Sequence, residues 1–70
     1  MAYKMSPHQQ RVVEEKAELD GRIERLASFL RSERAFNVEQ MEALRLERQL
    51  DLMEQLSELL GERISNFGVA

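Results

Sequence analysis

The apolar positions in the C-terminal half of this 70-residue chain cover more of a helix than one partner can bury. At about 100° per residue they form two adjacent stripes. The first stripe contains Leu46, Leu50, Met53, Leu60, Ile64 and Phe67, and the second contains Met41, Leu52, Leu56 and Leu59. A helix packed on one partner needs a stripe only slightly wider than 100°. The surplus predicts a second contact, most simply with another copy of the chain, and hence a protein that acts by binding.

A first helix is predicted over about residues 7–32. Ser6 can cap the free amides at its start, Pro7 suits the first helical position, and Gln9 completes a capping box. The apolar positions then recur at helical spacings of seven, four, three and four. These positions are Val12, Leu19, Ile23, Leu26 and Leu30.

A second helix is predicted over about residues 38–66. It follows a connection at 33–37, where the apolar residues show no sustained helical periodicity. Asn37 is a good N-cap residue, and Phe36 with Met41 has the spacing of a hydrophobic staple. Two long helices of similar length with a short connection predict an antiparallel hairpin.

The predicted fold is therefore all-α, a single domain over residues 1–70 in which a two-helix antiparallel hairpin dimerises into a four-helix bundle. The predicted hairpin and dimer core consists of Val12, Leu19, Ile23, Leu26 and Leu30 from the first helix and Leu46, Leu50, Met53, Leu60 and Ile64 from the second. Periodicity leaves open which stripe of the second helix faces the first helix and which faces the second copy.

Composition excludes several classes of function. The chain has no cysteine, and its ten basic and thirteen acidic side chains are interspersed, with a net charge of −3. No basic cluster favours nucleic acid, no apolar run approaches the roughly 18 residues of a membrane span, and the start lacks the apolar core of a signal peptide. We expect an intracellular protein with no cofactor, no metal site and no enzymatic activity. The one histidine, His8, continues the first stripe and is expected to pack at the end of the bundle.

Two polar residues interrupt the apolar stripes at similar heights in the hairpin. Lys16 occupies an apolar slot in the first helix, and Ser57 occupies one in the second. One interpretation is a polar layer that fixes the register of the helices, with Glu54 or Glu58 reaching Lys16. The alternative is that Lys16 lays its stem on the core and extends its ammonium to water.

Three long polar side chains, Arg45, Gln49 and Arg63, lie inside the wide apolar sector of the second helix. Arginine among leucines is typical of binding surfaces. The alternatives are an intersubunit pair with a glutamate of the second copy, or a stem that covers an apolar edge.

The chain resembles a family of small phage and prophage proteins over residues 8–67. The similarity lies in His8-Gln9-Gln10-Arg11-Val12-Val13, Glu15-Lys16-x-Glu18-Leu19-Asp20, Phe36-Asn37, Met41-x-x-Leu44-Arg45-x-x-x-Gln49 with Met53, and Leu60-Gly61-Glu62-Arg63-Ile64. The family includes anti-quorum-sensing proteins of Pseudomonas temperate phages, which resemble helical-hairpin dimers.

The resemblance implies an inhibitor that acts by protein–protein contact in the cytoplasm of the infected bacterial host. It implies binding to a LuxR-type quorum-sensing activator, blocking its DNA binding, and to the assembly ATPase of type IV pili. The candidate partner-binding residues are Phe36, Arg45, Gln49, Leu56 and Arg63. Two alternatives stay open: a phage structural or assembly protein, and a counter-defence protein that sequesters a small signalling ligand, such as a nucleotide, between protomers. For the second alternative, the sequence shows no obvious aromatic and basic pocket.

Overall fold

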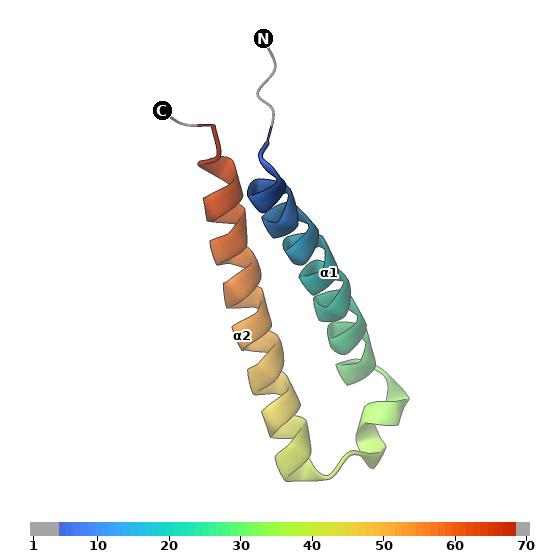
Figure 1. The fold of residues 1–70 in the computed structure, drawn as a ribbon. Coiled ribbons are helices and arrows are strands. Elements are labelled where there is room, and N and C mark those ends of the chain that lie inside the picture. Colours follow the sequence, from blue (N-terminus) through green and yellow to red (C-terminus); the bar gives the residue numbers. More distant parts are fainter. Residues whose placement is uncertain (1–4, 69–70) are drawn as a thin grey trace.

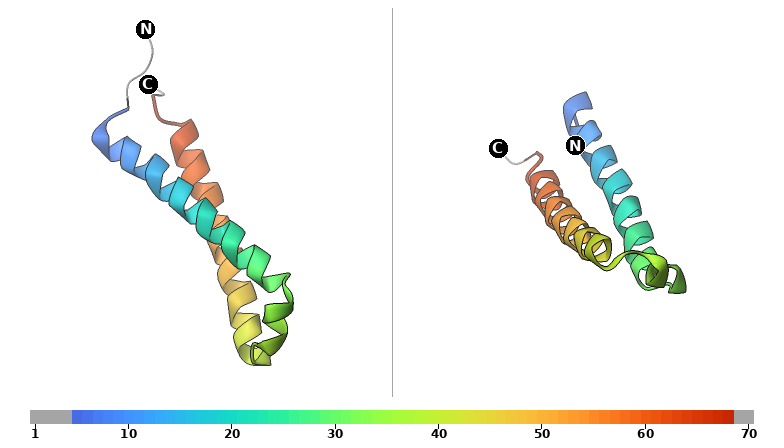
Figure 2. Two further views of the ribbon diagram at one scale, coloured as in Figure 1. Left: turned by 90° about the vertical axis from the view of Figure 1, so that its right-hand side faces the viewer. Right: turned by 90° about the horizontal axis from the view of Figure 1, so that it is seen from below.

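The computed structural model describes residues 5–68 and shows two antiparallel α-helices joined by one short 3-10 helix (Figure 1). Helix α1 spans Pro7–Leu30, the 3-10 helix η1 spans Glu33–Asn37, and α2 spans Gln40–Ser65. The described residues contain no strand. The hairpin is a rod of 53 × 15 × 15 Å, and the two helices cross at an angle when it is turned by 90° (Figure 2). Each helix therefore has one face on its neighbour and one long face away from it.

The start of α1 has the capping box that the sequence predicts. Ser6 Oγ accepts a hydrogen bond from the Gln9 amide at 3.2 Å, and Gln9 Oε1 accepts one from the Ser6 amide at 3.0 Å. The helix ends at Leu30, two residues earlier than predicted. At the helix end the Phe29 carbonyl accepts hydrogen bonds from both the Ser32 amide at 3.0 Å and Ser32 Oγ at 2.6 Å.

The predicted N-cap of the second helix, Asn37, is wrong. Asn37 is the last residue of η1, and Glu39 occupies the N-cap position of α2. The Glu39 carboxylate accepts hydrogen bonds from the amides of Met41 at 2.9 Å and Glu42 at 3.0 Å. A carboxylate is favourable here because it satisfies free amides and lies at the positive end of the helix dipole.

The predicted hydrophobic staple between Phe36 and Met41 is also absent. The chain forms a turn of 3-10 helix before α2, which leaves Phe36 86% exposed. Met41, which should have packed against it, is exposed as well. The start of α2 is therefore held by the Glu39 carboxylate, with Phe36 free on the surface.

The core lies along the first of the two apolar stripes. Val12, Leu19 and Leu60 are buried, and Ile23, Met53, Ile64 and Phe67 pack against them. The other predicted core residues, Leu26, Leu30, Leu46 and Leu50, are half-buried. The structure thus answers the question that periodicity left open: the stripe with Met53 and Leu60 faces α1. His8, expected to pack at the end of the bundle, is exposed in the single chain.

Within residues 5–68, no helix combines the length and the apolar character needed to cross a membrane.

Candidate binding face of helix α2

The second apolar stripe of α2 remains on the surface of the hairpin. Leu52 is 55% exposed and Leu56 is 44% exposed, although both are large apolar side chains in the middle of a helix. We call this surface the outward face and define it by Met41, Leu44, Leu52, Leu56 and Leu59, all exposed. Several exposed large apolar side chains on one helix face are typical of a surface that meets a partner.

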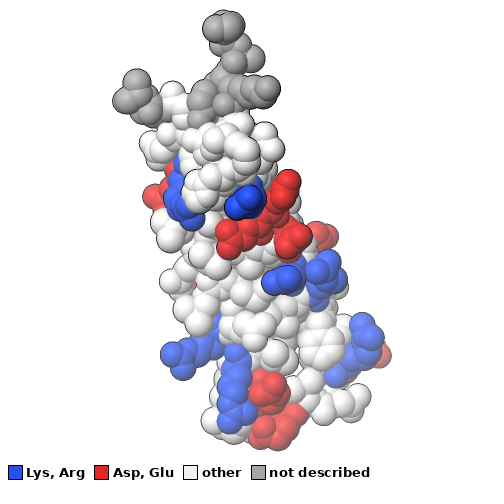
Figure 3. Space-filling view, viewed as in Figure 1, with Lys and Arg blue, Asp and Glu red and all other residues white. Residues whose placement is uncertain are grey.

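All three arginines of α2 share the outward face with these apolar residues. At about 100° per residue, Arg45, Arg48 and Arg63 lie within roughly 40° of Leu52. Glu42 lies beside Arg45, whereas the other five acidic residues of the helix follow a different line, along one flank: Glu47, Asp51, Glu54, Glu58 and Glu62. In Figure 3 acidic and basic side chains lie side by side in several places along the hairpin, with uncharged surface between these charged groups. The outward face is therefore apolar and cationic.

A shallow, open pocket of about 400 Å³ lies in the middle of the outward face. It is lined by Arg45, Arg48, Gln49, Leu52, Met53 and Leu56. The leucines form an apolar floor, and the arginines and the glutamine place hydrogen-bond donors around it. Guanidinium groups bind carboxylates and phosphates with two parallel hydrogen bonds, so the pocket suits an anion that also carries an apolar part.

The polar side chains at this pocket have few competing partners. Arg45 Nη1 lies 3.3 Å from Glu42 Oε1, but both side chains are more than half exposed, so this ion pair contributes little. Gln49 Nε2 lies 3.8 Å from Met53 Sδ. Within residues 5–68, no carboxylate lies at ion-pair distance from Arg48 or Arg63. The guanidinium groups are therefore available to an anionic ligand.

The pocket brings together three of the five candidate partner-binding residues, Arg45, Gln49 and Leu56. Arg63 shares the outward face but lies seven residues beyond Leu56, about 10 Å along the helix. Phe36 belongs to η1 and lies outside the pocket. Arg48, which the same wheel places beside Leu52, was not among the residues predicted from the sequence, so the basic pocket that the structure has was not predicted.

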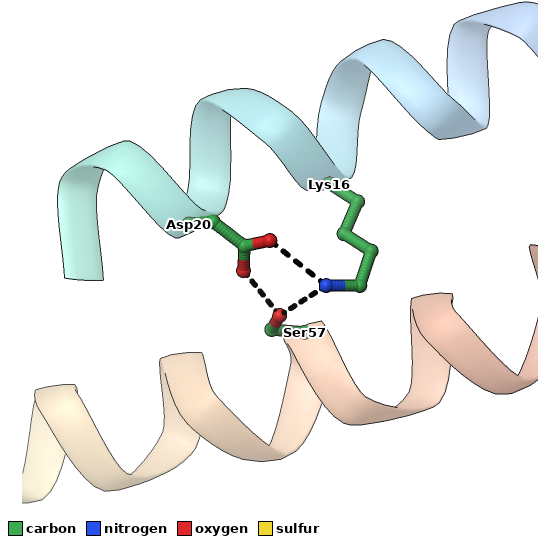
Figure 4. Close-up of polar contacts among 3 residues, drawn as sticks. All are labelled: Lys16, Asp20 and Ser57. Carbon is green, nitrogen blue, oxygen red and sulfur yellow. Dashed lines mark hydrogen bonds and ion pairs between the residues drawn. The ribbon is translucent and has the colours of Figure 1, made fainter. Parts of the chain in front are cut away.

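The polar layer between the helices consists of three residues, and their side chains point toward one another (Figure 4). Lys16 Nζ donates to Asp20 Oδ2 at 2.8 Å and to Ser57 Oγ at 3.1 Å. Ser57 Oγ, which is buried, donates in turn to Asp20 Oδ1. The acidic partner of Lys16 is therefore Asp20 of its own helix, and neither Glu54 nor Glu58, which lie on the flank of α2.

Lys16 combines features of both interpretations: its stem packs on the neighbouring helix, and its ammonium takes part in a polar layer. Its stem crosses α2 beside Gly61, where an added Cβ would lie 3.3 Å from Lys16 Cε, while the side chain keeps 29% of its surface exposed. Its ammonium nevertheless bridges the two helices through Ser57. The hydrogen bonds from Lys16 and then from Ser57 lower the pKa of Asp20, outweighing the smaller opposite effect of burial.

A second pocket of about 380 Å³ lies near the connection, lined by Glu24, Arg25, Ser28, Phe29 and Arg34. The Arg34 guanidinium lies over the Phe29 ring, with Cζ 6.0 Å from the ring centroid, at the limit of a cation–π contact. Glu24 gives this pocket mixed charge. It therefore differs from the pocket of the outward face, which contains no carboxylate.

Comparison with known proteins adds one finding. The family model of Sequestin matches residues 6–66 of the chain. The chain belongs to the Sequestin family. No curated protein and no solved structure matches it. The name Sequestin is consistent with a sequestering protein, and the matched region includes both helices and the whole pocket of the outward face.

Proposed function

We propose that this Sequestin-family protein sequesters a small anionic signalling molecule, such as a nucleotide, without transforming it chemically. The observation that carries the proposal is the pocket in which Arg45, Arg48 and Gln49 border an apolar floor on an exposed helix face. Two guanidinium groups match phosphate oxygens, and the leucines offer contact to a planar, poorly hydrated base. A sequestering protein needs only stoichiometric binding.

The ligand is held between two copies of the chain in this proposal. In the described part, one hairpin buries only three apolar side chains and leaves the outward face in water. Chains of this length usually need disulfides, metals or self-association for stability, and this chain has no cysteine. Pairing of two hairpins through α2 would form a four-helix bundle and would turn an open pocket into an enclosed one.

The proposal is tested by asking what the protein removes from a bacterial extract. The purified protein is incubated with the small-molecule fraction of cells undergoing a phage-defence response, washed and heat-denatured, and the released compounds are identified by mass spectrometry. We expect a phosphate-bearing compound in near-stoichiometric amount.

The variant pair Arg45→Gln and Arg48→Gln should lose this compound. Arg11→Gln with Arg22→Gln, two exposed arginines of α1, is the matched control and should keep it. Release of no phosphate-bearing compound from the wild-type protein, or equal release from both double variants, would contradict the proposal.

A second candidate is inhibition of a host protein, which the resemblance to phage proteins suggests. The observation that favours it is the extent of exposed apolar surface, which runs from Met41 to Leu59 and exceeds the pocket, together with the fully exposed Phe36. The targets would be a LuxR-type activator and the pilus assembly ATPase, in the cytoplasm of an infected host. Retention of such a protein by the wild-type chain, and its loss in Phe36→Ala, would favour this candidate over the first.

A further inference from the structure

We infer that anion binding and dimerisation of this protein are one coupled event. Two α2 helices pair antiparallel across their outward faces, and arginines from both copies then form a single anion site that is incomplete in the monomer. This inference rests on the proposed function. It adds that a second copy of the chain forms the other wall of the site and that dimerisation regulates binding.

The position of the pocket along α2 brings the pockets of two copies together in an antiparallel pair, as it would in a parallel one. Helix α2 spans Gln40–Ser65, so its midpoint falls between Leu52 and Met53. The pocket extends from Arg45 to Leu56 and includes this midpoint. Antiparallel helices that overlap along their full length have their twofold axis at the midpoint. The pocket of each copy therefore lies opposite the pocket of the other.

Charge also favours the antiparallel arrangement. In a parallel pair, every arginine of the outward face would lie at the same height as its own counterpart. In the antiparallel pair, residue numbers at the same height sum to 105, so Arg63 lies level with Glu42 of the second copy. Arg63 has no carboxylate at ion-pair distance within residues 5–68, and Glu42 lies on the edge of the outward face next to Arg45. The antiparallel arrangement therefore supplies Arg63 with a partner.

Arg48 gains no such partner, and Arg45 keeps only its exposed ion pair with Glu42 of its own copy. Residues 60 and 57 of the second copy lie level with Arg45 and Arg48, and these are Leu60 and Ser57. At about 1.5 Å per residue, the two Arg48 residues lie roughly 13 Å apart along the axis and the two Arg45 residues roughly 22 Å apart. Four cations would thus be gathered between apolar surfaces, where water screens their repulsion poorly. An anion with two or more charges bound among them removes this repulsion.

The coupling follows from the apolar contact between the outward faces and from the repulsion among their arginines. Without an anion, the apolar contact of Leu52, Leu56 and Leu59 favours pairing, whereas Arg45 and Arg48 oppose it. With a ligand that carries at least two phosphate groups, the apolar contact and the attraction between the arginines and the anion both favour the dimer. By linkage, such a ligand must tighten dimerisation by the same factor by which dimerisation tightens ligand binding.

Sedimentation equilibrium at constant ionic strength tests the coupling, with NaCl adjusted as each probe is added. The probes are sodium tripolyphosphate, cyclic di-AMP and, as an uncharged control, adenosine. We expect the two phosphate probes to lower the dimer dissociation constant at least tenfold and adenosine to leave it unchanged. The double variant Arg45→Gln and Arg48→Gln should dimerise at least threefold more tightly than the wild type without a probe, and should not respond to the probes.

Three results would overturn the inference. The first is binding of a phosphate probe, seen by calorimetry, with an unchanged dimer constant, which would show that anion binding does not depend on pairing. The second is a double variant that dimerises no more tightly than the wild type without a probe, because the arginines would then not oppose pairing. The third is an equal response of the double variant and the Arg11→Gln, Arg22→Gln control. The release of a compound from bacterial extract, which tests the proposed function, does not depend on any of these results.

Discussion

The two faces of α2 have similar numbers of apolar residues and entirely different surroundings. The face toward α1 combines buried Leu60 with a polar network in which Ser57 has partners on the neighbouring helix. The outward face combines exposed Leu52 and Leu56 with arginines, and no carboxylate reaches Arg48 in the described part of the chain. Apolar content alone therefore does not distinguish a core from a binding face, but the polar residues among the leucines do.

The largest expected difference between the two faces comes from truncating one leucine on each. Leu60→Ala removes a side chain that is 2% exposed, and it should lower the free energy of unfolding by about 3 kcal/mol. Leu56→Ala on the outward face should change it by less than about 0.5 kcal/mol in the monomer. Urea denaturation at a protein concentration too low for dimerisation measures both. Equal losses would mean that the outward face also contributes to the core of the single hairpin.

The polar network should give the next largest effect. Ser57→Ala removes the hydroxyl that bridges Lys16 and Asp20, and we expect a loss of about 1 kcal/mol. Gln49→Ala, an exposed polar truncation on the outward face, should have almost no effect on the same denaturation midpoint. A midpoint for Ser57→Ala equal to that of the wild type would show that the network does not stabilise the hairpin.

Two glycine substitutions compare a position of ordinary van der Waals contact with a slightly tighter one. Gly21→Ala should stabilise the protein by about 0.5–1 kcal/mol, because alanine favours the helix and its Cβ would lie at an ordinary 3.4 Å from Arg25 Nη1. Gly61→Ala should stabilise it less or not at all, since its Cβ would lie 3.3 Å from Lys16 Cε and displace that side chain. Thermal unfolding of the two variants measures the difference. A larger gain at Gly61 than at Gly21 would contradict close packing of Lys16.

The smallest expected effect is the acid dependence of the network. The pKa of Asp20 is lowered in the folded state, so its contribution is fully present above its unfolded pKa of about 3.9. The contribution is lost as the pH falls through the lower folded pKa. The difference in unfolding free energy between the wild type and Asp20→Asn should therefore shrink between about pH 5 and pH 2. A difference that stays constant over this range would exclude a charged network.

Periodicity and capping patterns predicted much of this fold, because two long amphipathic helices have regular signals. The Ser6 capping box and the apolar stripe of α1 are local features that residue spacing reveals. The start of α2 was misplaced because Asn37 and Glu39 can both cap a helix, and only the 3-10 turn before it decides between them.

The candidate site was partly predictable because residue spacing shows which side chains share a helix face. The helical wheel identified Arg45 and Gln49 as polar residues in an apolar sector, and it could have identified Arg48. It could not tell which stripe faces α1, because both stripes are equally apolar. The structure shows the stripe with Leu60 packed on α1, where Ser57 also contacts Lys16 and Asp20, residues about forty positions away in the chain.

Antiparallel pairing of the outward face of α2 with a second copy is measured most directly by the distance between two labels on α2. The chain has no cysteine, so spin labels can be attached separately at Asp51→Cys and Glu62→Cys, two exposed positions on the same flank. Pulsed electron resonance, with cyclic di-AMP present, then measures the distance between the two labels of a dimer. Because Asp51 is near the midpoint and Glu62 is far from it, we expect a distance below about 20 Å for Asp51→Cys and one near 30 Å for Glu62→Cys. Equal short distances for both labels, or no dipolar coupling for either, would contradict the account.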